Sequence, residues 1–158
     1  AIWEIDGEHF ESIDVGRICP DLPGVQLAVD IDHRPWGDGP VWVIDEQGQV
    51  RTKIRTDYAR HHALLDWTGD GVSEIVVAQS RSLYDGLGRR VATLSMDPQD
   101  DLDGDERLAL TGDFTGDGVP DVVLTTRAMR HVSIYRNEQG RKPDPPAPLG
   151  TEVNFTLY

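Results

Sequence analysis

A twelve-residue segment that occurs twice constrains the fold of this chain more than any other feature of its sequence. Residues 66–77 align with residues 113–124 without a gap, and Ser73 against Pro120 is the only unlike pair. The two copies are offset by 47 residues, from Asp66 to Asp113. A period of this length made of short strands is typical of β-propeller blades, whereas a parallel β-helix needs much shorter repeats.

The segments around the repeat have the composition of short strands. They are β-branched and apolar, and glycine, aspartate or proline separates them. The expected strands lie at 25–29, 41–44, 62–65, 74–78, 91–94, 107–110, 121–125 and 131–135. Residues 2–5 also alternate like a strand, and 153–158 alternate like a terminal strand behind the proline-rich connector 141–148. No stretch of the sequence shows a sustained helical period.

We therefore predict an all-β fold, a partial β-propeller with about three antiparallel blades. The chain is expected to form one propeller fragment over 1–158, with approximate blades at 1–52, 53–100 and 101–158. A closed propeller has roughly four to eight blades. We thus expect this chain to be the C-terminal part of a longer one, with the remaining blades as its intramolecular partners.

A second, weaker repeat supports the same period. Residues 45–48 resemble residues 137–140, and Gly48 lies 92 residues before Gly140, close to two periods. We expect the middle copy at the turn sequence 97–99. The first unit is degenerate, because 25–29 leads to an acidic stretch that residues 34–36 interrupt. Whether Asp30, Asp32 and Asp38 bind a metal there stays open.

The repeated loop has the acid spacing of a calcium site. Calcium takes about six to eight oxygen ligands and tolerates irregular geometry. The expected ligands are the side chains at positions 1, 3, 5 and 9 and the carbonyl at position 7. In the first copy they are Asp66, Thr68, Asp70, Val72 and Glu74, and in the second they are Asp113, Thr115, Asp117, Val119 and Asp121. Glycine at position 6 allows the sharp turn, and crowded carboxylates repel one another without a cation.

Two other kinds of loop, an EF-hand and a simple hairpin turn, fit these residues less well. An EF-hand needs a glutamate at position 12 and flanking helices, but Val77 and Leu124 occupy that position and strands flank the loops. A simple Asp-Gly hairpin turn does not require acids at positions 1, 5 and 9 in both copies. Elsewhere, the acidic run at 97–105 is expected to be a solvated loop, although 101–105 has partial calcium-loop spacing.

Charge and cysteine content exclude several classes of partner and bond. The net charge is −13, from 28 acidic and 15 basic residues, and such a surface repels nucleic acid and anionic lipid. No apolar run approaches the length of a membrane span, so membrane insertion is not expected. Cys19 is the single cysteine, which excludes an intrachain disulfide, and we expect it to be a buried structural thiol.

The Asp-x-Thr-Gly-Asp-Gly-x-x-(Asp/Glu) loops between strands resemble the FG-GAP or VCBS-type repeats of integrin α-subunit propellers and of many secreted bacterial proteins. A closer likeness is to the C-terminal region of bacterial rhamnogalacturonan-lyase-like proteins. It rests on the paired loops, the strand at 132–137, the proline-rich connector and the ending at 149–158, and it covers roughly residues 25–158.

The lyase resemblance implies an extracellular or periplasmic, calcium-dependent protein that acts on the pectin backbone by β-elimination. An acidic polysaccharide is then the expected partner. The chain is much shorter than that family, and no catalytic base can be mapped onto it, so enzymatic activity is left open. The alternative function is a non-catalytic FG-GAP module for carbohydrate binding or adhesion.

Basic side chains near the loops are candidate ligands for uronate carboxylates. Each of them singly is expected to be an ordinary surface or strand-end residue. They are His61, His62, Lys53, Arg55, Arg81, Arg89, Arg90, Arg127, Arg130 and His131. Tyr84 and Trp36 are weighed for stacking on sugar rings, but aromatic side chains are more often part of a core. The sequence has no recognisable Ser-His-Asp order, zinc spacing or phosphate-binding loop.

Overall fold

The structure is a computed structural model that describes residues 2–6, 9–31, 40–56, 61–95, 106–127 and 131–142. Within these ranges the chain forms eleven strands and no helix, which confirms the all-β prediction. The strands are β1 (Phe10–Gly16), β2 (Gln26–Ile31), β3 (Val41–Ile44), β4 (Val50–Ile54), β5 (His62–Leu65), β6 (Glu74–Val77), β7 (Ser82–Tyr84), β8 (Arg90–Thr93), β9 (Arg107–Gly112), β10 (Asp121–Thr126) and β11 (Val132–Tyr135). No helix in this described part is long and apolar enough to cross a membrane.

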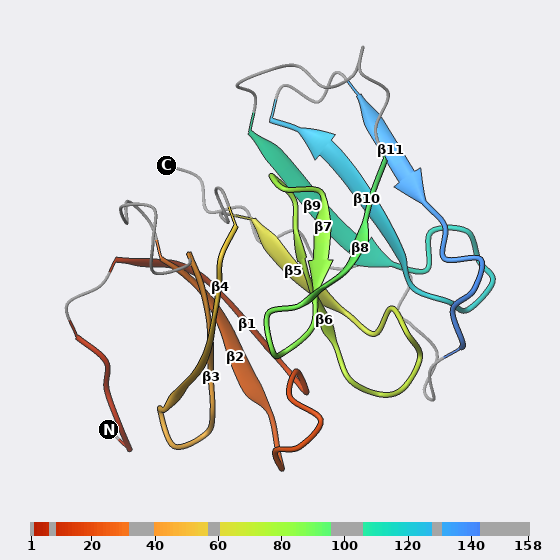
Figure 1. The fold of residues 1–158 in the computed structure, drawn as a ribbon. Helices are drawn as coiled ribbons and strands as arrows, with labels where there is room; N and C mark the ends of the chain where they lie inside the picture. The colour runs from red at the N-terminus through yellow and green to blue at the C-terminus, as the bar shows by residue number, and fades with distance from the viewer. Residues whose placement is uncertain are drawn as a thin grey trace.

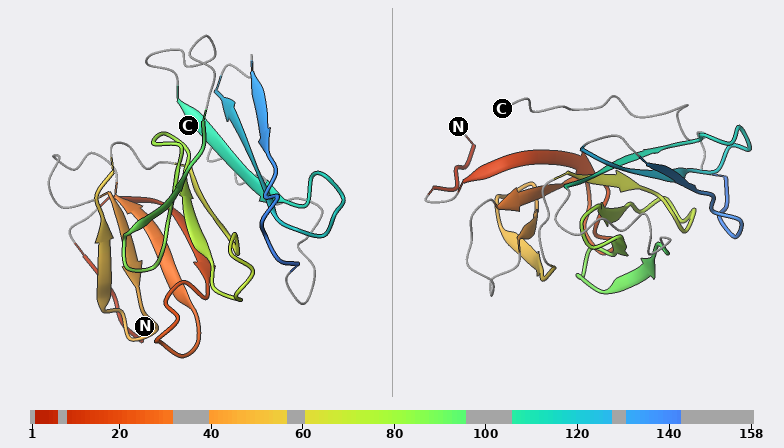
Figure 2. Two further views of the ribbon diagram at one scale, coloured as in Figure 1. Left: turned by 45° about the vertical axis from the view of Figure 1, so that its right-hand side comes forward. Right: turned by 90° about the horizontal axis from the view of Figure 1, so that it is seen from above.

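The strands of the described ranges form three antiparallel sheets in which consecutive strands are neighbours. Sheet 1 has the order β1-β2-β3-β4, sheet 2 has the order β5-β6-β7-β8, and sheet 3 has the order β9-β10-β11. The sheets lie side by side in chain order (Figures 1 and 2). The first strands of the sheets lie next to one another, β1 beside β5 and β5 beside β9.

Two apolar clusters join the sheets, and the alternation of side chains along β6 explains why. Ile75 and Val77 belong to the cluster that sheet 2 shares with sheet 1, whereas Val76 belongs to the cluster that sheet 2 shares with sheet 3. Successive strand residues point to opposite faces, so one short strand serves both contacts. All four residues of β6 are buried, as expected for a strand covered on both faces.

Most of the expected strands are confirmed, but two parts of the first unit are not. Residues 2–5 form no strand, and their side chains Trp3 and Ile5 pack on a third apolar cluster over β2 and β3. Residues 25–29 were expected to lead into an acidic loop. In the structure β1 leads into the loop 17–25, and β2 follows that loop. Because 17–25 contains a single acid, Asp21, the sequence pattern did not mark it.

The expected position of the middle turn is also wrong. The turn between β7 and β8 has the same hydrogen bonds as the turn between β3 and β4, since the N–H of Gly88 donates to the carbonyl of Asp85 and that of Gly48 to the carbonyl of Asp45. The middle copy is therefore 85–88 and not 97–99. Residues 97–99 lie outside the described residues, as do most of the proline-rich connector and the predicted terminal strand 153–158.

Cys19 is buried, as predicted, at 5% exposure. It lies in the connection between β1 and β2 and belongs to the apolar cluster between sheets 1 and 2. Burial in apolar surroundings is the main cause that raises the pKa of its thiol. The side chain therefore acts as a small apolar core residue.

Candidate functional site

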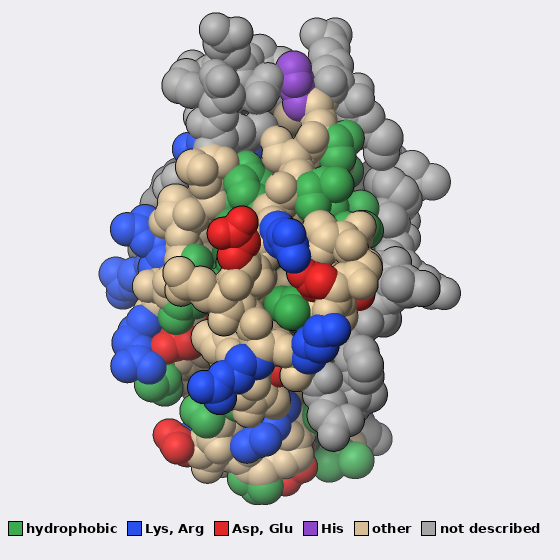
Figure 3. All heavy atoms as spheres, turned by 90° about the vertical axis from the view of Figure 1, so that its right-hand side faces the viewer, with side chains coloured by type: hydrophobic (Ala, Val, Ile, Leu, Met, Phe, Trp, Pro, Cys, Tyr) green, Lys and Arg blue, Asp and Glu red, His purple; other side chains and the backbone are tan. Residues whose placement is uncertain are grey.

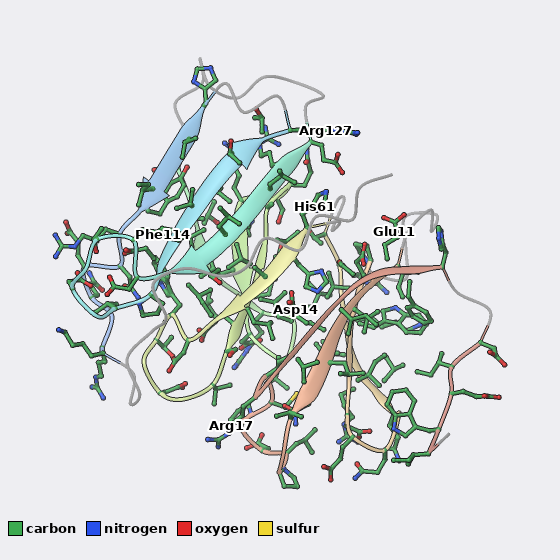
Figure 4. The ribbon with its side chains drawn as sticks, turned by 180° about the vertical axis from the view of Figure 1, so that it is seen from behind. Glu11, Asp14, Arg17, His61, Phe114 and Arg127 are labelled. Atoms are coloured by element: carbon green, nitrogen blue, oxygen red, sulfur yellow. The ribbon has the colours of Figure 1, made fainter. Side chains whose placement is uncertain are left out.

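The two repeated loops occupy equivalent places in the fold. Loop 66–74 joins the first and second strands of sheet 2, and loop 113–121 joins the first and second strands of sheet 3. Both lie at the end of the sheets where the first strands finish. Figure 4 shows Phe114 at this end and His61 and Arg127 at the opposite end.

In loop 66–74 the first aspartate organises the backbone. Asp66 Oδ1 accepts the N–H groups of Gly69 at 2.7 Å and Asp70 at 3.0 Å, and Asp66 Oδ2 accepts that of Gly71 at 2.9 Å. Asp70 Oδ1 accepts the N–H of Val72 at 2.9 Å. The acids at positions 1 and 5 thus accept four backbone N–H groups of their own loop.

Loop 113–121 repeats this network bond for bond. Asp113 Oδ1 accepts the N–H groups of Gly116 at 2.7 Å and Asp117 at 3.0 Å, and Asp113 Oδ2 accepts that of Gly118 at 2.8 Å. Asp117 Oδ1 accepts the N–H of Val119 at 2.9 Å. The sequence repeat is therefore a repeat of one three-dimensional loop.

The glycines at positions 4 and 6 allow this conformation. Their φ angles are 71° and 82° at Gly69 and Gly71, and 77° and 84° at Gly116 and Gly118. Residues with a Cβ rarely adopt such positive values, so the Gly-Asp-Gly sequence is required by the backbone. Only the glycine at position 6 was predicted from the sequence to be needed for the turn.

The acid at position 9 closes each loop onto its beginning. Glu74 Oε2 accepts the N–H of Trp67 at 2.8 Å, and the hydroxyl of Thr68 lies 3.4 Å from Glu74 Oε1. Burial is the main cause that raises the pKa of Glu74, and repulsion from Asp70 and Asp66 raises it further. These two acids make the ionised form of Glu74 less favourable in the absence of a cation.

Asp121 closes the other loop and leaves one oxygen without a partner. Its Oδ2 accepts the N–H groups of Phe114 and Thr115, both at 3.0 Å, so the carboxylate is turned into the loop. The residue is fully buried, and Oδ1 has no hydrogen-bond partner in the described part of the protein. A buried carboxylate oxygen in that state is unfavourable unless a ligand satisfies it.

Sheet 1 has a matching loop that the sequence analysis missed, and Gln26 closes it. Its Oε1 accepts the N–H groups of Ile18 and Cys19, both at 2.9 Å, and the side chain is 1% exposed. Gly16 pairs with Gln26 as Leu65 pairs with Glu74 and Gly112 with Asp121, so this loop, counted to Gln26, is one residue longer than the repeated loops. It begins at Arg17, and Asp21 is its single acid. A neutral amide is therefore sufficient for closure, and the acids at the other two loops are not needed for closure alone.

The possible third site around Asp30 does not correspond to a loop of this kind. Asp30 lies within β2, where its Oδ1 accepts the hydroxyl of Ser12 at 2.8 Å. Asp32 and Asp38 lie outside the described residues.

The predicted calcium ligands of each copy lie in one loop, but their side chains are not arranged around a common point where an ion could bind. Among the described residues, no set of three or more His, Cys, Asp or Glu side chains is placed to hold a metal ion. The acids at positions 1 and 5 face backbone N–H groups instead. Calcium at these loops therefore stays a prediction.

A second polar cluster, between sheets 1 and 2, was not predicted. The imidazole of His62 is fully buried, with Nδ1 3.3 Å from Ser12 Oγ and Nε2 3.1 Å from the carbonyl oxygen of Ala28 and 3.4 Å from Asp14 Oδ2. Burial raises the pKa of Asp14, His62 opposes this shift, and Asp30 adds to it. The cluster links β5 to β1 and β2, and Figure 4 shows Asp14 between β1 and β5.

Several of the basic residues weighed for uronate binding pair with acids. Arg89 Nε lies 2.7 Å from Asp85, and Arg127 lies 3.5 Å from Glu106. His61, at a positive φ of 62°, also contacts Glu106, at 3.1 Å. Around sheet 3, Lys and Arg side chains stand among Asp and Glu side chains (Figure 3). A role of these residues in binding uronates stays a prediction.

Comparisons with protein-family models, curated proteins and solved structures found no match to this chain.

Proposed function

We propose that this chain is a calcium-stabilised portion of a β-propeller, in which each sheet is a blade and each repeated loop binds one Ca²⁺. Three up-and-down antiparallel sheets side by side, with their first strands adjacent, support this proposal. The ligands would be the oxygens of Asp66, Thr68, Asp70, Val72 and Glu74 in one loop, and of Asp113, Thr115, Asp117, Val119 and Asp121 in the other.

The observation that carries the proposal is the buried, unpartnered Oδ1 of Asp121. It belongs to a loop that brings three carboxylates into nine residues, and a cation would neutralise them and satisfy this oxygen. Gln26 strengthens the argument, because it closes the matching loop of sheet 1 without charge, in a loop that begins with Arg17 and has one acid, Asp21. Calcium fits the donor set, since all of the donors are oxygens.

Thermal unfolding with calcium and with chelator tests the proposal. A ligand that binds only the folded state stabilises it by about 2.7 kcal/mol at a hundredfold excess over Kd, and two independent sites would roughly double this. We expect the melting temperature to rise by many degrees with calcium and much less with magnesium, which demands tighter octahedral geometry. An unchanged melting temperature in metal-free protein after calcium is added would show that the loops are Asp-Gly turns only.

We also propose the wider role that the sequence resemblance implies, a secreted, polysaccharide-active protein related to rhamnogalacturonan lyases. The alternative is a non-catalytic FG-GAP module for carbohydrate binding or adhesion. Incubation with rhamnogalacturonan and calcium, followed by the absorbance of unsaturated products, distinguishes them only if this chain contains the active site. We expect little or no cleavage, because about three blades do not enclose a propeller's central cleft. Affinity electrophoresis against the same polysaccharide tests binding separately.

A further inference from the structure

The two repeated loops share a sequence and a backbone network, but they differ in what faces the aspartate at position 5. Asp117 Oδ2 accepts hydrogen bonds from Arg136 Nε at 3.1 Å and Nη2 at 2.9 Å. The matching Asp70 has no hydrogen bond or ion pair from Oδ2 to any described residue. Asp117 is therefore paired with a guanidinium, whereas the arginine near the other loop, Arg17, has its Nη1 3.9 Å from the position that a Cβ would take at Gly71 and makes no hydrogen bond or ion pair with Asp70 among the described residues.

The fold explains why Arg136 reaches this acid. It follows β11, which pairs with β10, and β10 leaves the loop at Asp121. Lys142 adds positive charge nearby, since its Nζ lies 3.1 Å from the position that a Cβ would take at Gly118. The N–H of Val119 is the main cause that lowers the pKa of Asp117, and Arg136 and Lys142 lower it further.

We propose that Arg136 competes with the cation at loop 113–121. The inference rests on the proposed calcium function, and it concerns regulation of that same site. Arg136 binds Oδ2 of Asp117, one of the two oxygens that this aspartate can offer a metal. The positive charge of Arg136 also repels a divalent ion. The side chain of Arg136 is 56% exposed, so it is free to swing into solvent when the cation enters.

The Asp121 carboxylate shows that Arg136 does not complete the loop. Arg136 contacts Asp117 Oδ2, while Asp121 Oδ1 stays buried and unpartnered. The guanidinium therefore neutralises the charge of Asp117 and leaves the Asp121 carboxylate available to the ion. Binding at this loop requires the Arg136–Asp117 ion pair to break, whereas Asp70 of loop 66–74 has no such pair to a described residue.

Calcium titration by calorimetry of variants with one loop disabled tests the proposal. Asp70→Asn leaves loop 113–121 for measurement, and Asp117→Asn leaves loop 66–74. We expect Arg136→Gln to tighten calcium binding about three- to tenfold in the Asp70→Asn background, the size expected for release of an exposed ion pair together with one repulsive charge. In the Asp117→Asn background it should change affinity less than about twofold.

Arg89→Gln is the matched control. Arg89 is an exposed arginine at the same end of sheet 2, and it pairs with Asp85, which belongs to no repeated loop. It should leave calcium affinity unchanged in both backgrounds. Arg136→Lys keeps the charge but loses the two hydrogen bonds to Asp117. The calcium affinity of loop 113–121 in this variant should therefore lie between that of the protein with Arg136 and that of Arg136→Gln.

The outcomes separate this inference from the proposed function. If both loops bind calcium but Arg136→Gln leaves loop 113–121 unchanged or weaker, the competition is wrong and the calcium function stands. A gain of equal size with Arg89→Gln would also overturn it, because a general charge effect would then suffice. If neither loop binds calcium, both proposals are wrong.

Discussion

Gln26, Glu74 and Asp121 begin the second strands of the three sheets and perform the same structural task with different charge. Each accepts backbone N–H groups from the start of its own loop. The acid form occurs only where the loop also begins with an aspartate, since Arg17 takes that place in sheet 1. A single side chain thus distinguishes a closed turn from a loop with excess negative charge.

Glu74→Gln should have opposite effects with and without calcium. In chelator the variant should be more stable than the wild type by about 0.5–1 kcal/mol, because glutamine still accepts the Trp67 N–H and removes a repelled charge. At a hundredfold excess of calcium it should be less stable by up to about 2.7 kcal/mol, through loss of one site. Urea unfolding in both buffers measures the crossover.

Gln26→Glu is the converse variant. It places a carboxylate at a position that is 1% exposed, in a loop whose single acid, Asp21, is exposed. We expect a loss of about 1–3 kcal/mol. Calcium should not restore it, because Arg17 stands where the repeated loops have their first aspartate and Asp21 is the single acid of this loop. A calcium-dependent rescue would contradict the comparison of the three loops.

The cluster around His62 predicts a pH dependence. Because burial raises the pKa of Asp14 in the folded state, its contribution to stability is present below about pH 4, the ordinary range of an aspartate, and is lost as pH rises through the raised value. Asp14→Asn should remove this part of the decline in unfolding free energy. Urea unfolding between pH 3.5 and about pH 7 measures it, and Asp21→Asn, in an exposed turn, should not alter the slope.

The turn between β7 and β8 and the loop between β1 and β2 pack closely where sheets 1 and 2 meet. The hydroxyl of Thr52 donates to the carbonyl oxygen of Gly86 at 2.8 Å. A Cβ at Gly86 would clash with the carbonyl oxygen of Ile18, which is backbone and has little freedom to move. The absence of a side chain at Gly86 therefore permits this contact between two sheets.

Gly86→Ala should lower the unfolding free energy by at least about 2 kcal/mol, because the clash forces a backbone shift. Gly116→Ala is the matched control: its φ is 77°, but a Cβ there would meet nothing within 4 Å. It should cost only the backbone strain, about 1–2 kcal/mol. Chemical denaturation of the two variants compares them, and a smaller loss at Gly86 would contradict the close-packing argument.

The three sheets share apolar clusters and should unfold as one unit. Sheet 2 contributes to the clusters on both of its sides, and the side chain of Asn137, two residues after β11, donates to the carbonyl oxygen of Trp67 in loop 66–74. Loss of either neighbour would expose apolar side chains of sheet 2. One cooperative transition is the expected result.

Asp70→Asn and Asp117→Asn should each remove about half of the calcium-dependent rise in melting temperature, because each disables one of two independent sites in one cooperative unit. The double variant should show no rise. Calorimetric scans with calcium and with chelator measure these differences. Two separate transitions, each responding to one variant, would show that the sheets unfold independently.

The sequence predicted the strands of sheets 2 and 3 except β7, and the acidic loops mark where the first strand of each sheet ends and the second begins. In sheet 1 it predicted β2 and β3 but missed β1 and β4, and the loop that Gln26 closes has one acid, Asp21, and no repeated charge pattern. The partner of Asp117 could not be predicted from the sequence either, because Arg136 becomes its neighbour only through the pairing of β10 with β11. The chemistry of the loops was visible in the sequence, but their electrostatic difference depends on contacts distant along the chain.

The alternation along β6 limits which changes in length the chain tolerates. An inserted or deleted residue in this strand would exchange the side chains that face sheet 1 with those that face sheet 3, and both interiors would be disrupted together. Connections between strands are free of this constraint: 32–40 joins β2 to β3, whereas the shorter 78–81 joins β6 to β7. Related chains should therefore differ by insertions in the connections between second and third strands, while the phase of the middle strands stays fixed.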